Sequence, residues 1–169
     1  MKNSSTHLLP LGVYGMSFNG QVLERGFWLY IWKIAAPRGE YLYVGRTGDS
    51  SSPNAASPFR RIGQHLDFSD NAKANSLARR LRERGVNPLD CEFEMYAIGP
   101  LFPEQDSMEK HRPFRDKVAA LECALSETLR ARKYNVLGVQ RSRKQLDRQV
   151  FEQVLIAIDQ FFPPTERAT

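Results

Sequence analysis

The sequence predicts an α+β fold (α/β in the broad sense) in which helices flank a small central β-sheet containing antiparallel strands. Two runs rich in aromatic and β-branched residues, 26–34 and 41–45, are separated by one short turn, as in a hairpin. Two segments with helix signals separate them from a third alternating run at 90–99, and two more helical segments follow it. We therefore expect the order β-β-α-α-β-α-α.

The chain has the size and composition of a single domain. Its 169 residues are 41% apolar and 25% charged, which is typical of a globular protein that buries its own core. We expect one domain over residues 1–169, with an N-terminal extension at 1–25, a core at 26–138 and a C-terminal helical segment at 139–169. Within the extension, Asn19-Gly20 lies between β-prone residues and favours a small hairpin.

Neither a membrane span nor a secretion signal is expected. No run of 18 apolar residues occurs, and the first residues, MKNSSTHLLPLG, lack the apolar core of a signal peptide. The two cysteines, Cys91 and Cys123, have neither CxxC spacing nor a matching histidine pair. A zinc site is therefore not expected, and a reducing cytoplasm fits the sequence best.

Three strands are assigned from composition and alternation. GFWLYIWKI at 26–34 has the aromatic and β-branched composition of a buried strand. AAPRGE supplies a turn, after which YLYVG at 41–45 returns as the second strand. In DCEFEMYAIG at 90–99, the alternation places Phe93 and Met95 on one face.

Capping and stop residues delimit the first two helices. Ser57 is a good N-cap and Pro58 suits the first helical position, so a helix is expected over about 58–67. A second helix should cover about 72–84, with Gly85 as its C-terminal stop.

Two further helices are expected after the third strand. A long helix should begin near Phe114, because Pro113 punctuates the chain, and should end before Asn135. The last helix should cover about 144–162, and its apolar stripe is formed by Val150, Val154, Leu155, Ile158 and Phe162.

The charge distribution favours a polyanionic partner. The net charge is +5, and the basic residues gather in RRLRER at 79–84 and in the stretch 130–148. Solvated helix faces are often basic without any partner, so each cluster alone is weak evidence. Together they favour nucleic acid.

Arg61 and His65 share one edge of the helix expected over 58–67. They are four residues apart and lie beside its apolar stripe, whereas Arg60 points to solvent. Taken singly, Arg61 reads as a surface arginine with a packed stem, and His65 as a half-buried histidine bonded to the backbone.

Glu122 lies on the apolar face of the long helix. It shares that face with Val118 and Leu125, whereas Glu127 points about 140° away, at roughly 100° per residue. A carboxylate on an apolar face is costly unless it is paired or binds a metal. Glu122 therefore requires either an arginine partner, for which Arg61 is a candidate, or Mg²⁺, which binds one or two carboxylates together with waters and phosphate.

Taken together, these residues resemble the GIY-YIG nucleases. The second triplet of that family corresponds to Tyr43-Val44-Gly45, and RRIGQH supplies the arginine and the histidine that many members carry four residues later. LECALSETLRARKYNVLG supplies a glutamate, Glu122, followed by an asparagine, Asn135. The resemblance covers roughly residues 26–138, and it is the ordered set that makes it specific.

The first triplet has two candidates. Gly12-Val13-Tyr14 matches it by letters, but Tyr14 lies 29 residues before Tyr43, which is too far for strands joined by a short turn. Tyr30 lies 13 residues before Tyr43, one hairpin away. We take Tyr30, although Trp28 and Leu29 depart from the family pattern.

The resemblance implies a metal-dependent endonuclease that hydrolyses DNA phosphodiester bonds. It implies Mg²⁺ or Mn²⁺ on Glu122, charge stabilisation by Arg61, and a tyrosine phenol as general base, which could be Tyr43 or Tyr30. His65 would orient a tyrosine or relay its proton. The expected substrate-binding residues are Gly45, Arg46, Arg79, Arg80, Arg82, Asn135, Arg141 and Arg143.

Several readings remain open at the level of sequence. A restriction or phage-defence nuclease, a structure-specific repair nuclease and a non-catalytic nucleic-acid-binding domain are all compatible with the fold. A structural protein with a basic face is a further class, but it leaves Glu122 unexplained. We expect DNA as the partner and no membrane or small-molecule ligand, and a homodimer is left open.

Overall fold

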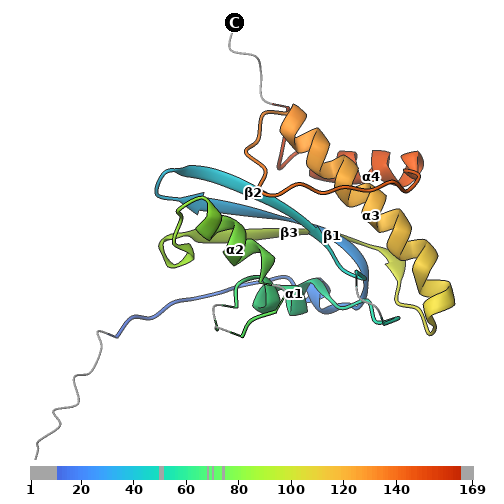
Figure 1. The fold of residues 1–169 in the computed structure, drawn as a ribbon, viewed down its shortest axis with the longest axis horizontal. Helices are drawn as coiled ribbons and strands as arrows, with labels where there is room; N and C mark the ends of the chain where they lie inside the picture. Colours follow the sequence, from blue (N-terminus) through green and yellow to red (C-terminus); the bar gives the residue numbers. More distant parts are fainter. Residues whose placement is uncertain (1–10, 50–51, 68, 70, 74, 165–169) are drawn as a thin grey trace, which may run out of the picture.

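The computed structural model describes residues 11–49, 52–67, 69, 71–73 and 75–164. A three-stranded antiparallel sheet forms its centre, in the order β2-β1-β3, and two helices cover each face (Figure 1). The expected fold class and order of elements are confirmed. The strands are β1 (Gly26–Ala36), β2 (Gly39–Arg46) and β3 (Glu92–Pro103); the helices are α1 (Pro58–His65), α2 (Ser76–Glu83), α3 (Met108–Ala131) and α4 (Arg148–Ile158).

The central strand β1 is buried on both faces, which explains its nearly continuous apolar sequence. Phe27, Leu29 and Ile31 belong to the core beneath α3 and α4. Tyr30 and Trp32 belong to the second core, beneath α1 and α2. Alternation along one strand thus divides the interior into two layers.

The β2 edge of the sheet is extended by a further backbone segment. Beyond β2, the backbone after α3 adds a parallel bridge between Leu42 and Val136, with Leu42 N donating to Asn135 O at 2.9 Å. β3 forms the opposite edge of the sheet. Phe93 and Met95 on β3 both pack on the core beneath α1 and α2, as their alternation predicts.

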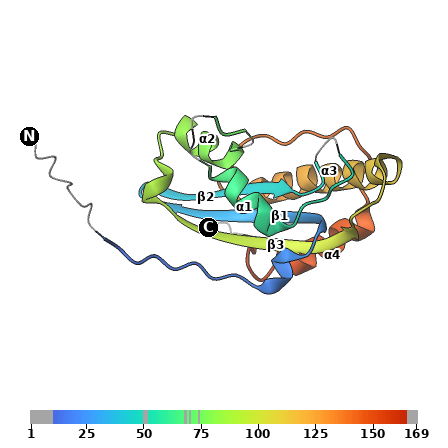
Figure 2. The ribbon, with the colours of Figure 1, turned by 90° about the horizontal axis from the view of Figure 1, so that it is seen from below.

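The expectation of a hairpin at Asn19-Gly20 is wrong. The backbone there forms a short 3₁₀-helix, Gly20–Leu23, and the Asn19 side chain caps it by accepting a hydrogen bond from Gln21 N at 3.0 Å. Asn19 has φ −77°, whereas the expected turn needs a positive φ at this position. Residues 11–19 form no regular element. Phe18 packs on Phe59 of α1, with ring centroids 4.7 Å apart, and the chain before it extends away from the body of the fold (Figure 2).

The start of α3 also differs from the expectation, since the helix begins at Met108 and includes Pro113. Ser107 caps it by accepting from Lys110 N, and the buried His111 anchors its first turns against Phe27, with ring centroids 4.9 Å apart. This anchoring compensates for the backbone hydrogen bond that proline cannot donate.

The other helices match their predicted positions with shorter bounds. Ser57 caps α1 by accepting from Arg60 N, α2 begins at Ser76 instead of near 72, and Asp147 caps α4. The predicted stripe of α4 faces the core: three of its members are buried and two pack against them, namely Val154, Ile158 and Phe162, and Val150 and Leu155.

Candidate active site

Tyr30 and Gly45 face each other across β1 and β2. They are register partners, and the Tyr30 side chain is completely buried. A Cβ on Gly45 would stand 2.4 Å from the Tyr30 ring. The glycine of the second triplet therefore leaves room for the aromatic ring of the first, a packing reason that the sequence did not reveal.

The Tyr30 hydroxyl joins three segments of the chain. It lies 2.6 Å from His65 Nε2 on α1, accepts from Arg61 Nε at 3.3 Å, and donates to the Arg46 carbonyl at 3.2 Å. The predicted pairing of Tyr30 with the strand of Tyr43 is confirmed, as is its proximity to Arg61 and His65. The Tyr30 side chain has no exposed surface, so its hydroxyl is buried within this cluster.

His65, at the end of α1, is enclosed between two tyrosines. Its ring centroid lies 5.5 Å from that of Tyr30 and 5.2 Å from that of Tyr43, with edge-on geometry in both pairs. Burial, together with the positive charge of Arg61, lowers its pKa to about 4. His65 is therefore neutral at pH 7 and able to accept a proton.

Arg61 projects from α1 toward the loop that follows β2. Its guanidinium donates to Gln64 Oε1 at 2.9 Å and to Asp49 Oδ2 at 3.1 Å. Arg60 is exposed, as predicted. A small hollow of about 130 Å³ borders Arg61. It is lined by Gly48, Asp49, Ser52, Asn54, Ala56, Arg60, Arg61 and Gln64.

Glu122 pairs with Arg46, across the gap between α3 and the end of β2. Glu122 Oε2 accepts from Arg46 Nε at 2.9 Å, and both side chains are less than one-fifth exposed. Burial raises the pKa of Glu122, an effect that Arg46 opposes. The prediction that Glu122 needs a partner is confirmed, but the partner is Arg46 and not Arg61; Glu127 is exposed, as expected.

Tyr43 connects the α1 side of the site with Glu122. Its side chain is half-buried, its ring meets His65, and its hydroxyl has a hydrogen bond with Ser76. Burial and the negative charge of Glu122 raise its pKa. The fold thus gathers all five predicted catalytic residues, which are Tyr30, Tyr43, Arg61, His65 and Glu122.

Asp49 and His111 are the polar residues of this region that the sequence reasoning missed. Asp49 holds Arg61, and its negative charge acts on Glu122 and both tyrosines. His111 Nε2 lies 3.0 Å from the carbonyl of Gly48, whose φ of +74° makes the turn before Asp49. The sequence could have indicated Asp49, because it follows directly after the second strand and its glycine-containing turn, in YVGRTGD.

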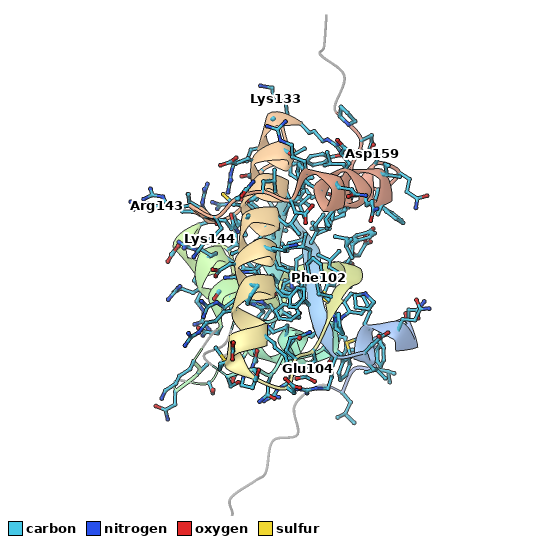
Figure 3. All side chains as sticks on the ribbon, turned by 90° about the vertical axis from the view of Figure 1, so that its right-hand side faces the viewer. Phe102, Glu104, Lys133, Arg143, Lys144 and Asp159 are labelled. Carbon is cyan, nitrogen blue, oxygen red and sulfur yellow. The ribbon has the colours of Figure 1, made fainter. Side chains whose placement is uncertain are left out.

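The predicted phosphate-binding residues lie on two neighbouring segments. Arg79 and Arg80 on α2 pair with Glu83, at 3.8 and 3.0 Å, and Arg82 is exposed. Arg80 packs against Gly138, so α2 adjoins the segment that carries Arg141 and Arg143. Both of those arginines are exposed, and Figure 3 shows Arg143 projecting away from the body of the fold.

Among the described residues, neither Asn135 nor Tyr14, the tyrosine that was not chosen, is hydrogen-bonded to the catalytic group. Asn135 has an exposed side chain, and among the described residues it contributes only its carbonyl, to Leu42 N. Tyr14 is 93% exposed in the extension. Of the two candidates, Tyr30 is therefore the one that lies beside Arg61 and His65.

The oxygen donors suit a hard divalent cation. Within the described part of the chain, no three His, Cys, Asp or Glu side chains converge as a closed metal site. Glu122 offers one buried carboxylate and Asp49 a second one near it, which fits the one or two carboxylates that Mg²⁺ takes alongside water and phosphate. Arg46 engages Glu122 Oε2 in this state.

A more apolar hollow, of about 640 Å³, lies away from this group. Its lining includes Trp28, Trp32 and Met95 from the sheet and Phe161 from beyond α4, and it contains none of the five catalytic candidates. An apolar surface of this kind offers no ligand for a phosphodiester. The polar group at the end of β2 is therefore the candidate active site.

Comparisons with protein-family models, curated proteins and solved structures gave no match. None of the helices in the described residues is both long and apolar enough to cross a membrane. The resemblance to the GIY-YIG nucleases therefore rests on the sequence motifs alone.

Proposed function

We propose that this protein is a metal-dependent endonuclease that hydrolyses DNA phosphodiester bonds. The observation that carries the proposal is the convergence of Tyr30, His65 and Arg61 in one hydrogen-bonded cluster, with Tyr43 at its side. Glu122 completes the group from a helix far away in sequence. A purely structural role gives no reason for so many polar groups at one sheet end.

Arg61 and Arg60 are the residues that bind the scissile phosphate in this proposal. Both border the hollow beside Asp49, and a guanidinium provides several donors to non-bridging phosphate oxygens. Gln64 and Asp49 hold Arg61 in place, so its charge is oriented before the substrate arrives.

We assign Tyr43 as the general base, whose phenol takes the proton from the attacking water. It is half-buried, whereas Tyr30 has no exposed surface, so Tyr43 is the one that substrate can reach. Its raised pKa means that the phenol needs a nearby proton acceptor, and neutral His65 lies against its ring. Tyr30 then serves as a positioning residue, which holds both His65 and Arg61.

Glu122, with Asp49 near it, is the residue that would hold Mg²⁺ or Mn²⁺. Such a cation, when bound, supplies positive charge that stabilises the charge developing on the phosphate and on the leaving oxygen. In the structure, the Glu122 carboxylate is paired with Arg46. A requirement for a divalent cation in cleavage is therefore the sharpest test of Glu122 as a metal ligand.

The test is incubation of the purified chain with plasmid DNA, single-stranded DNA and RNA, each with Mg²⁺, Mn²⁺ or EDTA. We expect nicking or cutting of DNA with either cation and none in EDTA. Unchanged cleavage in excess EDTA would exclude Glu122 as a metal ligand. Cleavage of RNA alone would contradict DNA as the substrate.

A nucleic-acid-binding domain without catalysis is the second candidate. The Arg46–Glu122 ion pair favours it, because a carboxylate already paired with arginine is not free for a metal. The two candidates are separated by the same assay: DNA binding without cleavage in any cation supports the second. The proposal includes a role in restriction or phage defence, with structure-specific repair as the alternative. It also includes a DNA partner and a cytoplasmic location, and it leaves a homodimer open; both cysteines are free thiols.

A further inference from the structure

Arg46 reaches from the end of β2 to α3 and is held there at two points. Its Nε donates to Glu122 Oε2 at 2.9 Å, and its Nη1 donates to the Arg115 carbonyl at 3.2 Å. The side chain is 19% exposed, so the guanidinium is largely withdrawn from solvent. Two acceptors on one helix therefore fix this cation against the carboxylate of Glu122.

A divalent cation at Glu122 competes with this arrangement. Both cations seek the same carboxylate, and two positive groups within contact distance repel each other strongly where water is largely excluded. Removing Arg46 without replacement leaves a buried carboxylate unpaired, which is also unfavourable. The site therefore exchanges one cation for another.

We propose that Arg46 is a resident counter-ion of Glu122, which must leave that carboxylate before a divalent cation can bind there. Arg46 thereby sets the metal affinity of the site. The proposal rests on the proposed function, which makes Glu122 the metal ligand.

A phosphate offers the displaced guanidinium a new partner. The carbonyl of Arg46 accepts from the Tyr30 hydroxyl, which in turn accepts from Arg61, so the backbone of Arg46 adjoins the proposed phosphate-binding group. A DNA phosphate that pairs with Arg46 removes it from Glu122 and lowers the cost of metal binding. DNA and metal should therefore bind cooperatively, each raising the affinity for the other by the same factor.

The test measures Mn²⁺ affinity directly, by the loss of the free Mn²⁺ electron-paramagnetic-resonance signal on titration, without any turnover. We expect Arg46→Met to bind Mn²⁺ roughly 5- to 150-fold more tightly than the parent chain, the usual range of such couplings. Arg46→Lys keeps the charge without the fork-shaped guanidinium, and it should fall between the two. If Arg46→Met does not fold, the Arg46→Lys comparison tests the same competition.

Arg25→Met is the matched control. Arg25 also pairs with a glutamate, Glu104, but that pair is more exposed and lies outside the candidate site. Its removal takes the arginine from a carboxylate, which keeps a hydrogen bond from Ala55 N at 2.9 Å, and changes the net charge by the same amount. A general effect of charge would therefore appear in both variants. We expect Arg25→Met to bind Mn²⁺ like the parent.

A second titration adds a short DNA duplex. In the parent, DNA should tighten Mn²⁺ binding, and in Arg46→Met this gain should shrink, because the competing cation is already gone. Glu122→Gln should lose the Mn²⁺ site altogether.

Two results would overturn the inference in different ways. If Glu122→Gln loses Mn²⁺ and Arg46→Met binds it no more tightly than the parent, Glu122 is a ligand but Arg46 does not compete. If Glu122→Gln binds Mn²⁺ as the parent does, the metal assignment of the proposed function fails, and the competition fails with it.

Discussion

At the scale of single residues, the three hydrogen bonds of the Tyr30 hydroxyl favour one tautomer of His65. If His65 carries its proton on Nε2, His65 and Arg61 both donate to the phenol oxygen, and the phenol donates to the Arg46 carbonyl. This tautomer uses all three contacts at once. It leaves His65 Nδ1, which has no hydrogen-bond partner in the described residues, as a buried proton acceptor.

The two tyrosines should respond differently to loss of the hydroxyl. We expect Tyr43→Phe to lower the cleavage rate by about 10²- to 10⁴-fold, the range of a general acid–base group, with little change in stability. Tyr30→Phe should lower both the rate and the free energy of unfolding, by about 1–3 kcal/mol, because His65 and Arg61 lose a buried partner. Cleavage kinetics and urea unfolding measure the two effects.

Tyr14→Phe is the control for both, because Tyr14 is exposed in the extension. It should match the parent in both rate and stability. Full activity of Tyr43→Phe would remove this phenol from the mechanism.

His65 should make stability depend on acid pH. Its pKa of about 4 in the folded state lies below its ordinary value of 6.5, so the unfolded chain binds more protons between these two values. Stability should therefore fall as the pH drops from 6.5 toward 4, by up to about 3 kcal/mol from this group. His65→Gln should flatten that decline in urea-unfolding curves recorded across this range. An equally steep decline in His65→Gln would show that other groups cause it.

At the scale of elements, the hairpin and the helices were predictable because their signals are local. The 13-residue spacing from Tyr30 to Tyr43 identified the paired strands, and Ser57 identified the start of α1. Pro113 misled the placement of α3, because the anchoring of His111 against Phe27 is a tertiary contact. The Arg46–Glu122 pair was beyond reach for the same reason, since its partners are 76 residues apart.

The packing of Tyr30 on Gly45 yields a prediction about β1 and β2. In Gly45→Ala, the new methyl group would stand 2.4 Å from the Tyr30 ring, so the strands or the ring must shift. We expect a loss of about 1–3 kcal/mol and of most activity, because the Tyr30 hydroxyl moves with its ring. For a chain of this size, the midpoint temperature of thermal unfolding should fall by about 2–4 °C for each kcal/mol of stability lost.

Gly63→Ala is the matched control. Gly63 lies within α1, exposed, with no atom near the position of a new methyl group. Alanine there should stabilise the chain by about 0.5–1 kcal/mol, because it favours the helix. Equal thermal stability of Gly45→Ala and the parent would contradict the packing account.

At the scale of the whole molecule, α2 and the segment after α3 form one basic surface. Arg80 packs on Gly138, which brings the two predicted clusters together, and the site lies at the adjacent end of β2. Under the proposed function, this surface contacts DNA phosphates without reading sequence, so its affinity for DNA should fall with salt.

The double variant Arg82→Ala, Arg143→Ala should weaken DNA binding uniformly across sequences. Each lost phosphate contact should reduce the slope of log affinity against log salt by about one. Fluorescence anisotropy at several salt concentrations measures it. Lys33→Ala, Lys110→Ala changes the charge equally in side chains that pair with Glu40 and Asp106, and should keep the parent slope. Identical slopes for the two double variants would exclude this basic surface as the part of the molecule that contacts DNA phosphates.

The account as a whole depends on Glu122, and one comparison tests it most directly. Glu122 and Glu127 lie on the same helix, one paired and largely buried, the other exposed. With Mg²⁺, we expect Glu122→Gln to bind DNA like the parent but to cleave it at least about 10²-fold more slowly, whereas Glu127→Gln should bind and cleave like the parent. Undiminished cleavage by Glu122→Gln, or loss of cleavage in Glu127→Gln alone, would contradict the proposed active site.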